Sequence, residues 1–74
     1  MKCTIEHGLV CDIVMYDVEN KKYYKLVVYT DGRLVFVSIP AEAVKNWQEC
    51  IGQYTDLECT MSTYDGKAKF KIAE

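Results

Sequence analysis

The most reactive side chains of this chain are four cysteines and a single histidine. Cys3, His7 and Cys11 recur every four residues on a predicted strand, which places neighbours about 13 Å apart. A histidine activates a thiol only within hydrogen-bonding distance, so this spacing does not predict a nucleophile. No cysteine pair has the C-x-x-C spacing of zinc sites, and no hydrolase or phosphate-loop motif is present. We therefore expect a non-catalytic protein without metal or cofactor.

The thiols and the histidine are instead expected to be structural. Free cysteine behaves as a small apolar side chain, so Cys3, Cys11, Cys50 and Cys59 are predicted to be buried and reduced, with a disulfide pair left open. His7 shares the odd, core-facing positions of the first strand, which predicts a buried or half-buried ring.

A row of lysines near the C-terminus suggests a different chemistry, the binding of phosphate groups. Lys67, Lys69 and Lys71 alternate with apolar residues, so they share one face of a strand at intervals of about 7 Å. This interval is close to the spacing of phosphates along an extended nucleic-acid strand. Lysines on an exposed strand also oppose edge-to-edge pairing, so a purely solubilising role stays open.

Two Asp-Gly dipeptides predict tight hairpin turns, which define the side chains that share a face. At 65–66, a two-residue turn pairs Met61 with Phe70 on an apolar face and leaves Tyr64 beside the lysines. At 31–32, the inner pairs are Val28–Val35, Leu26–Val37 and Tyr24–Ile39, and the outer pairs are Tyr29–Leu34, Val27–Phe36 and Lys25–Ser38, with Tyr23 at the end. The second hairpin is therefore expected to be apolar on both faces, also if its turn contains a bulge.

Five strands and one helix would position these side chains. The strands are predicted at 3–16, 22–30, 33–39, 53–64 and 67–72, with a bend near Gly8 and a connection over 17–21. Pro40 begins a helix of about three turns that ends at Gly52. Its apolar stripe is Val44, Trp47 and Ile51. This order predicts a mainly β, OB-like Greek-key barrel with one helix between strands 3 and 4; an open sheet with a covering helix is the alternative.

Length and charge restrict the class of protein. The 74 residues are expected to form one domain, 1–74, because so short a chain holds one core. Eleven acidic and nine basic side chains give a net charge of −2, which excludes a uniformly basic clamp but not a local basic patch. No apolar run approaches the roughly 20 residues of a membrane span, and the N-terminus lacks a signal-peptide core. We therefore expect a cytoplasmic protein without membrane contact.

Three short motifs suggest a family: Lys21–Lys22–Tyr23–Tyr24 at the start of a long hairpin, Gly52–Gln53–Tyr54 before the fourth strand, and Tyr64–Asp65–Gly66 near the end. With these motifs and its length, the chain resembles the small single-stranded-DNA-binding proteins of filamentous phages and mobile elements, the gene V type. The resemblance implies a dimeric barrel that coats single strands cooperatively. The predicted helix and the negative net charge depart from that family.

Aromatic side chains interleaved with basic ones suit single-stranded nucleic acid, because rings stack on bases while cations neutralise phosphates. We therefore expect single-stranded nucleic acid as the partner. The expected binding residues are Tyr23, Lys25, Tyr29, Phe36, Tyr64, Lys67, Lys69 and Lys71, and the resemblance to the gene V type implies phosphate contacts at Lys21, Lys22 and Arg33 as well. The alternative is a protein-binding module or inhibitor that uses the apolar face of the 22–39 hairpin. A homodimer through this face is compatible with either function.

Overall fold

Three tight turns of one type connect the antiparallel hairpins of this structure, a computed structural model that describes residues 1–73. Glu19–Asn20, Asp31–Gly32 and Asp65–Gly66 have positive φ at both positions, between 50° and 76°. This is type I′ geometry, whose twist matches that of the flanking strands. The two Asp-Gly turns agree with the sequence prediction. The first turn does not, because the strands continue through most of the predicted connection at 17–21.

The strands and the helix follow the predicted order. β1 spans Lys2–Val18, β2 Lys21–Thr30, β3 Arg33–Ile39, β4 Tyr54–Tyr64 and β5 Lys67–Ile72. A 3-10 turn, η1 (Ala41–Ala43), and a short helix, α1 (Val44–Gln48), lie between β3 and β4. The predicted mainly β class, with one helical segment in this position, is confirmed.

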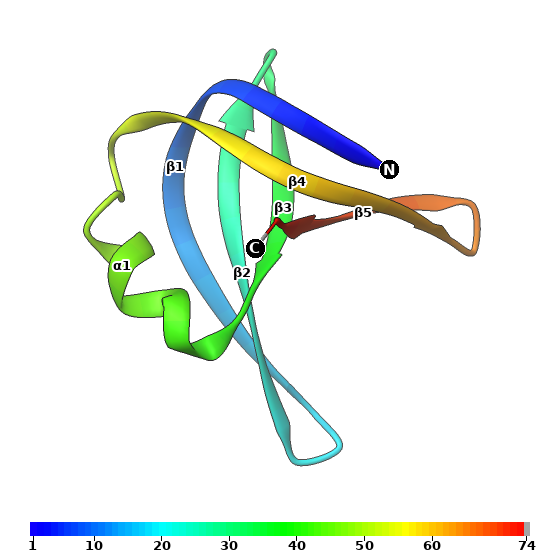
Figure 1. Cartoon of the computed structure of the whole chain (residues 1–74). Coiled ribbons are helices and arrows are strands. Elements are labelled where there is room, and N and C mark those ends of the chain that lie inside the picture. Colours follow the sequence, from blue (N-terminus) through cyan, green and yellow to red (C-terminus); the bar gives the residue numbers. More distant parts are fainter. Residues whose placement is uncertain (74) are drawn as a thin grey trace.

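All five strands belong to one sheet that closes on itself (Figure 1). The order around the ring is β1-β2-β3-β5-β4, with β4 paired to β1; the β3–β5 pair is parallel and the other pairs are antiparallel. Directly paired residues lead from Lys2 through Thr60, Lys71, Ser38 and Lys25 back to β1 at Val14. The ring therefore closes with a large stagger, which tilts the strands and leaves a narrow interior that side chains fill.

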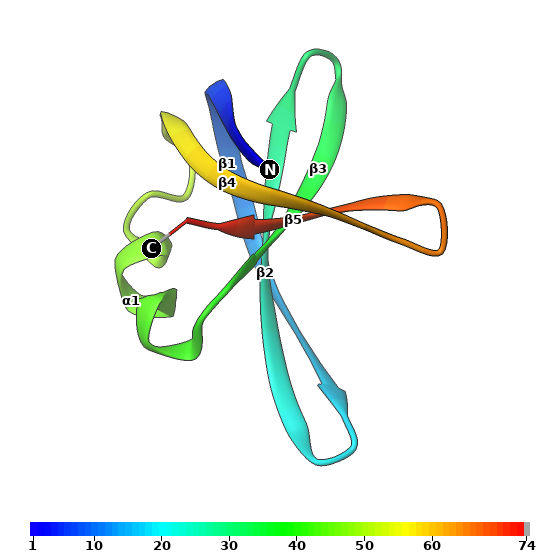
Figure 2. The ribbon, with the colours of Figure 1, turned by 45° about the vertical axis from the view of Figure 1, so that its right-hand side comes forward.

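The interior is apolar. Its buried side chains are Val10, Leu26, Val28, Val37, Ile39, Leu57 and Cys59. Trp47 of α1 packs against this cluster, as its position in the helix predicts. Figure 2 shows the β1–β2 and β2–β3 hairpin ends extending from the ring in opposite directions, while the β4–β5 end projects to the side.

β1 changes the face that it buries because it contains two irregularities. Its register against β4 shifts between Ile5 and Gly8, and its register against β2 shifts at Cys11. Each extra residue reverses the alternation of inward and outward side chains. The uniform odd-face pattern predicted for this strand is therefore wrong: Val10 is buried, whereas His7 and Cys11 are exposed.

Gly8 lies beside the first irregularity, where the sequence predicts a bend. A Cβ atom on Gly8 would lie 2.6 Å from Cγ1 of Val28, 3.1 Å from Cγ2 of Ile5 and 3.2 Å from Cδ1 of Leu57. Glycine is thus required here because core side chains from two neighbouring strands approach the β1 backbone.

The helical segment is shorter than predicted. After α1, Cys50 donates its backbone N–H to the Trp47 carbonyl at 3.0 Å, which continues the chain as tight turns and not as an α-helix. Gly52, with φ of 87°, then redirects the chain, and its N–H bonds the Val10 carbonyl at 2.7 Å. Ile51 is exposed, and Cys50 packs against the core in its place. In the described part of the chain, no helix is long and apolar enough to cross a bilayer.

Candidate functional site

The parallel pairing of β3 with β5 joins two surfaces that the sequence predicts separately. Val37 lies beside Phe70, so the outward residues Phe36 and Lys69 are neighbours across this pair. A groove of about 420 Å³ runs along it. The groove is lined by Lys25, Arg33, Leu34, Val35, Phe36, Ser38, Lys67, Ala68, Lys69 and Phe70. We refer to it as the β3–β5 groove.

Positive charge is concentrated in the β3–β5 groove. Four of its lining residues are basic, namely Lys25, Arg33, Lys67 and Lys69, and none of its described lining residues is acidic. The whole chain nevertheless has a net charge of −2. Because a concave apolar wall focuses the field of nearby charges, this groove favours an anionic ligand.

Exposed apolar side chains lie in the β3–β5 groove and beside it. Phe36, Leu34 and Tyr29 keep 50%, 55% and 46% of their surfaces exposed, although they lie within strands. The β2–β3 register pairs Tyr29 with Leu34, Val27 with Phe36 and Lys25 with Ser38. The prediction that this hairpin is apolar on both faces is therefore confirmed.

A pair of stacked tyrosines continues this surface onto the β1–β2 hairpin. The rings of Tyr16 and Tyr23 have centroids 5.6 Å apart and planes inclined by 22°. The Lys25 Nζ lies 5.3 Å from the centre of the Tyr16 ring, within cation–π range. Lys25 is thereby held between the stacked rings and the β3–β5 groove, which it also lines.

No protein-family model, curated protein or solved structure matches this chain. The resemblance to the gene V type therefore rests on its short motifs and its length.

The predicted binding residues occupy several parts of this surface. The groove is lined by Lys25, Arg33, Phe36, Lys67 and Lys69, and the β1–β2 hairpin carries Lys21, Lys22 and Tyr23, all exposed. Tyr29 faces outward beside Leu34, and Lys71 faces outward opposite Thr60. Lys22 is paired with Asp17 across the β1–β2 hairpin. Tyr64 ends β4, but its side chain lies outside the described residues.

None of the four cysteines lines the β3–β5 groove. All four are free: Cys59 is buried, and Cys3 and Cys50 are half-buried. The prediction of buried thiols fails for Cys11, which is exposed at the second irregularity of β1. Burial raises the pKa of the Cys59 thiol, and Cys3, directly opposite on β1, raises it further. A raised pKa keeps this thiol protonated and unreactive.

No cluster of three or more His, Cys, Asp or Glu suited to a metal ion occurs within residues 1–73.

His7 is not a buried structural residue, contrary to the prediction. Its backbone has φ of 53° at the first irregularity of β1, which turns the side chain out of the core. Its N–H donates to Oδ1 of Asp56 at 2.9 Å, and its ring stacks on Tyr54 with centroids 5.7 Å apart. This pair lies outside the β3–β5 groove.

Two residues that lie beside the predicted binding residues are not themselves predicted from the sequence. Tyr16 supports Lys25, and a tight turn at Glu19–Asn20 would have placed it opposite Tyr23 by register alone. Lys2 faces Thr60 through the pairing that closes the ring. No local pattern signals that pairing, because it joins strands far apart in the sequence.

Proposed function

We propose that this protein binds single-stranded nucleic acid across the outward face of β2, β3 and β5, and that its closed sheet is an OB-like barrel. The observation that carries the proposal is the β3–β5 groove, whose described lining residues include four cations, an exposed ring and no acidic residue. Phosphates and bases are the chemical groups that such a surface suits.

Binding is proposed to use two kinds of contact. Bases stack on Phe36 and Tyr29, each for about 1–3 kcal/mol, while the cations of the groove neutralise phosphates. Lys67 and Lys69 are spaced by about 7 Å along β5, which allows each to meet a separate phosphate. Only bases that are not stacked and paired within a duplex can stack on these rings, so the surface should favour single strands over duplex.

The aromatic contribution is tested with the double variant Tyr29→Ala and Phe36→Ala. We expect affinity for an oligothymidylate to fall at least tenfold, about 1.4 kcal/mol, with the salt dependence unchanged because no cation is removed. Fluorescence anisotropy measures both quantities. Both side chains face outward, so the thermal unfolding midpoint should change little.

A matched control removes a tyrosine and an aliphatic side chain elsewhere on the surface. Tyr54→Ala with Ile51→Ala fits this purpose, because both residues are exposed and neither lines the groove. Equal loss of affinity in the two double variants would contradict base stacking at Tyr29 and Phe36.

A second candidate function is a protein-binding module that uses the same face. Leu34 favours it, because an aliphatic side chain that is 55% exposed beside two rings resembles the apolar centre of a protein interface. Salt separates the two functions: phosphate contacts weaken steeply as salt rises, whereas an apolar interface is nearly indifferent to it.

A further inference from the structure

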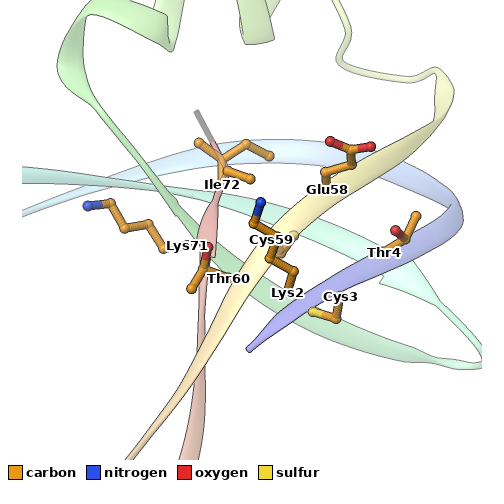
Figure 3. Close-up of a pocket in the computed structure, with 9 residues that line it drawn as sticks. Lys2, Cys3, Thr4, Glu58, Cys59, Thr60, Lys71 and Ile72 are labelled. Carbon is orange, nitrogen blue, oxygen red and sulfur yellow. The ribbon is translucent and has the colours of Figure 1, made fainter.

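A second concavity lies next to the β3–β5 groove, across β5 and on the seam that closes the ring. It has a volume of about 600 Å³. Its lining residues are Lys2, Cys3, Thr4, Glu58, Cys59, Thr60, Lys71, Ile72 and Ala73. The residues labelled in Figure 3 belong to three segments: the start of β1, the middle of β4 and the end of β5. We refer to this concavity as the seam pocket.

One row of paired outward residues runs through the seam pocket. Lys2 is paired with Thr60, and Thr60 is paired with Lys71. Neighbouring strands are about 4.8 Å apart, so the two lysines start from backbones about 10 Å apart. In Figure 3 the Lys71 side chain extends to one side of β5, while Lys2 lies on the other side, over β4.

The same row connects the seam pocket with the β3–β5 groove. Lys71 lines the seam pocket and is the parallel-sheet neighbour of Ser38, which lines the groove. Ser38 is in turn paired with Lys25, another lining residue of the groove. Hydroxyl and ammonium groups therefore follow one another from the groove across β5 and β4 to the start of β1.

We propose that the phosphate backbone of a bound single strand leaves the β3–β5 groove over Lys71 and ends at Lys2, with the Thr60 hydroxyl as a donor between them. This inference rests on the proposed function and lengthens its binding site. It also makes ring closure part of recognition, because Lys2 reaches the site only through the pairing of β1 with β4.

Glu58 limits this path. It is paired with Thr4, and both lie two residues along their strands from the row of Lys2 and Thr60, about 7 Å away. Its exposed carboxylate repels a phosphate that leaves this row along β4. The backbone is thus confined to the row of hydroxyl and ammonium groups.

Variants of opposite expected effect test the path. Lys2→Gln should weaken binding of an oligothymidylate of about twelve nucleotides roughly three- to tenfold and reduce its salt slope by about 0.7. Glu58→Gln should strengthen binding of the same oligonucleotide. Neither variant should alter binding of an oligothymidylate of about five nucleotides, which the groove alone accommodates. Lys2 and Glu58 are both exposed, so the fold should tolerate both changes.

Lys45→Gln is the matched control. It removes the same charge from an exposed position on α1, outside both concavities, and should leave the salt slope for the long oligonucleotide unchanged. If Lys2→Gln and Lys45→Gln behave alike while the wild-type protein binds both oligonucleotides, the extended path is wrong and the groove stands. Failure of the wild-type protein to bind either oligonucleotide would overturn the proposed function, and the path with it.

Discussion

Phe36, Tyr29 and Gly8 show what single positions contribute to this protein. The two rings remain half exposed within strands, where they do not add to the core. Gly8 has the opposite role, because the absence of its side chain lets Val28 and Leu57 close over the β1 backbone. The two exposed rings are proposed to serve binding, whereas Gly8 serves stability.

Gly8→Ala is expected to lower the free energy of unfolding by about 1–3 kcal/mol, the usual cost of forcing extra atoms into a packed core. The new Cβ would be 2.6 Å from Cγ1 of Val28, and Cβ atoms in real structures essentially never come so close to another heavy atom, so the surrounding core would have to shift. Urea denaturation measures the loss. As a comparison, Gly66→Ala adds a Cβ that meets nothing within 4 Å, so only its positive φ of 74° is unfavourable. A Gly8→Ala protein as stable as the wild type would show that the core yields at this point.

At the scale of the elements, the two hairpins with Asp-Gly turns are predictable and β1 is not. Asp-Gly turns define the registers of the β2–β3 and β4–β5 hairpins, because two-residue turns leave one pairing that keeps apolar faces together. β1 contains two irregularities whose positions depend on the strands that it pairs with. The predicted helix is longer than α1 because the apolar spacing of Val44 and Trp47 does not distinguish an α-helix from a segment that continues in tight turns.

The Glu19–Asn20 turn offers a test at this scale. Glu19 has φ of 50°, a conformation that glutamate adopts less readily than asparagine. Glu19→Asn should therefore raise the free energy of unfolding by about 0.5–1 kcal/mol, as measured by urea denaturation. Glu42→Asn removes the same charge from an exposed residue of η1 and should bring no such gain. A loss of stability in Glu19→Asn would argue against a type I′ turn at this position.

For the whole molecule, the order of strands around the ring determines which side chains share a surface. The sequence predicts an apolar hairpin and a row of lysines, but their proximity follows from the parallel pairing of β3 with β5. That pairing joins distant segments and has no local signature. Ring closure likewise brings Lys2 beside Thr60. The chain thus combines a negative net charge with a local basic groove, which composition alone does not reveal.

The central claim is most directly tested by titrating a labelled single-stranded oligonucleotide with the wild-type protein at several salt concentrations, with duplex of the same sequence as the control. If the four cations of the β3–β5 groove each meet a phosphate, the logarithm of the association constant should fall against the logarithm of salt concentration with a slope of about −3. Duplex should bind more weakly throughout. Absence of single-strand binding at low salt, or binding that is indifferent to salt, would contradict the account.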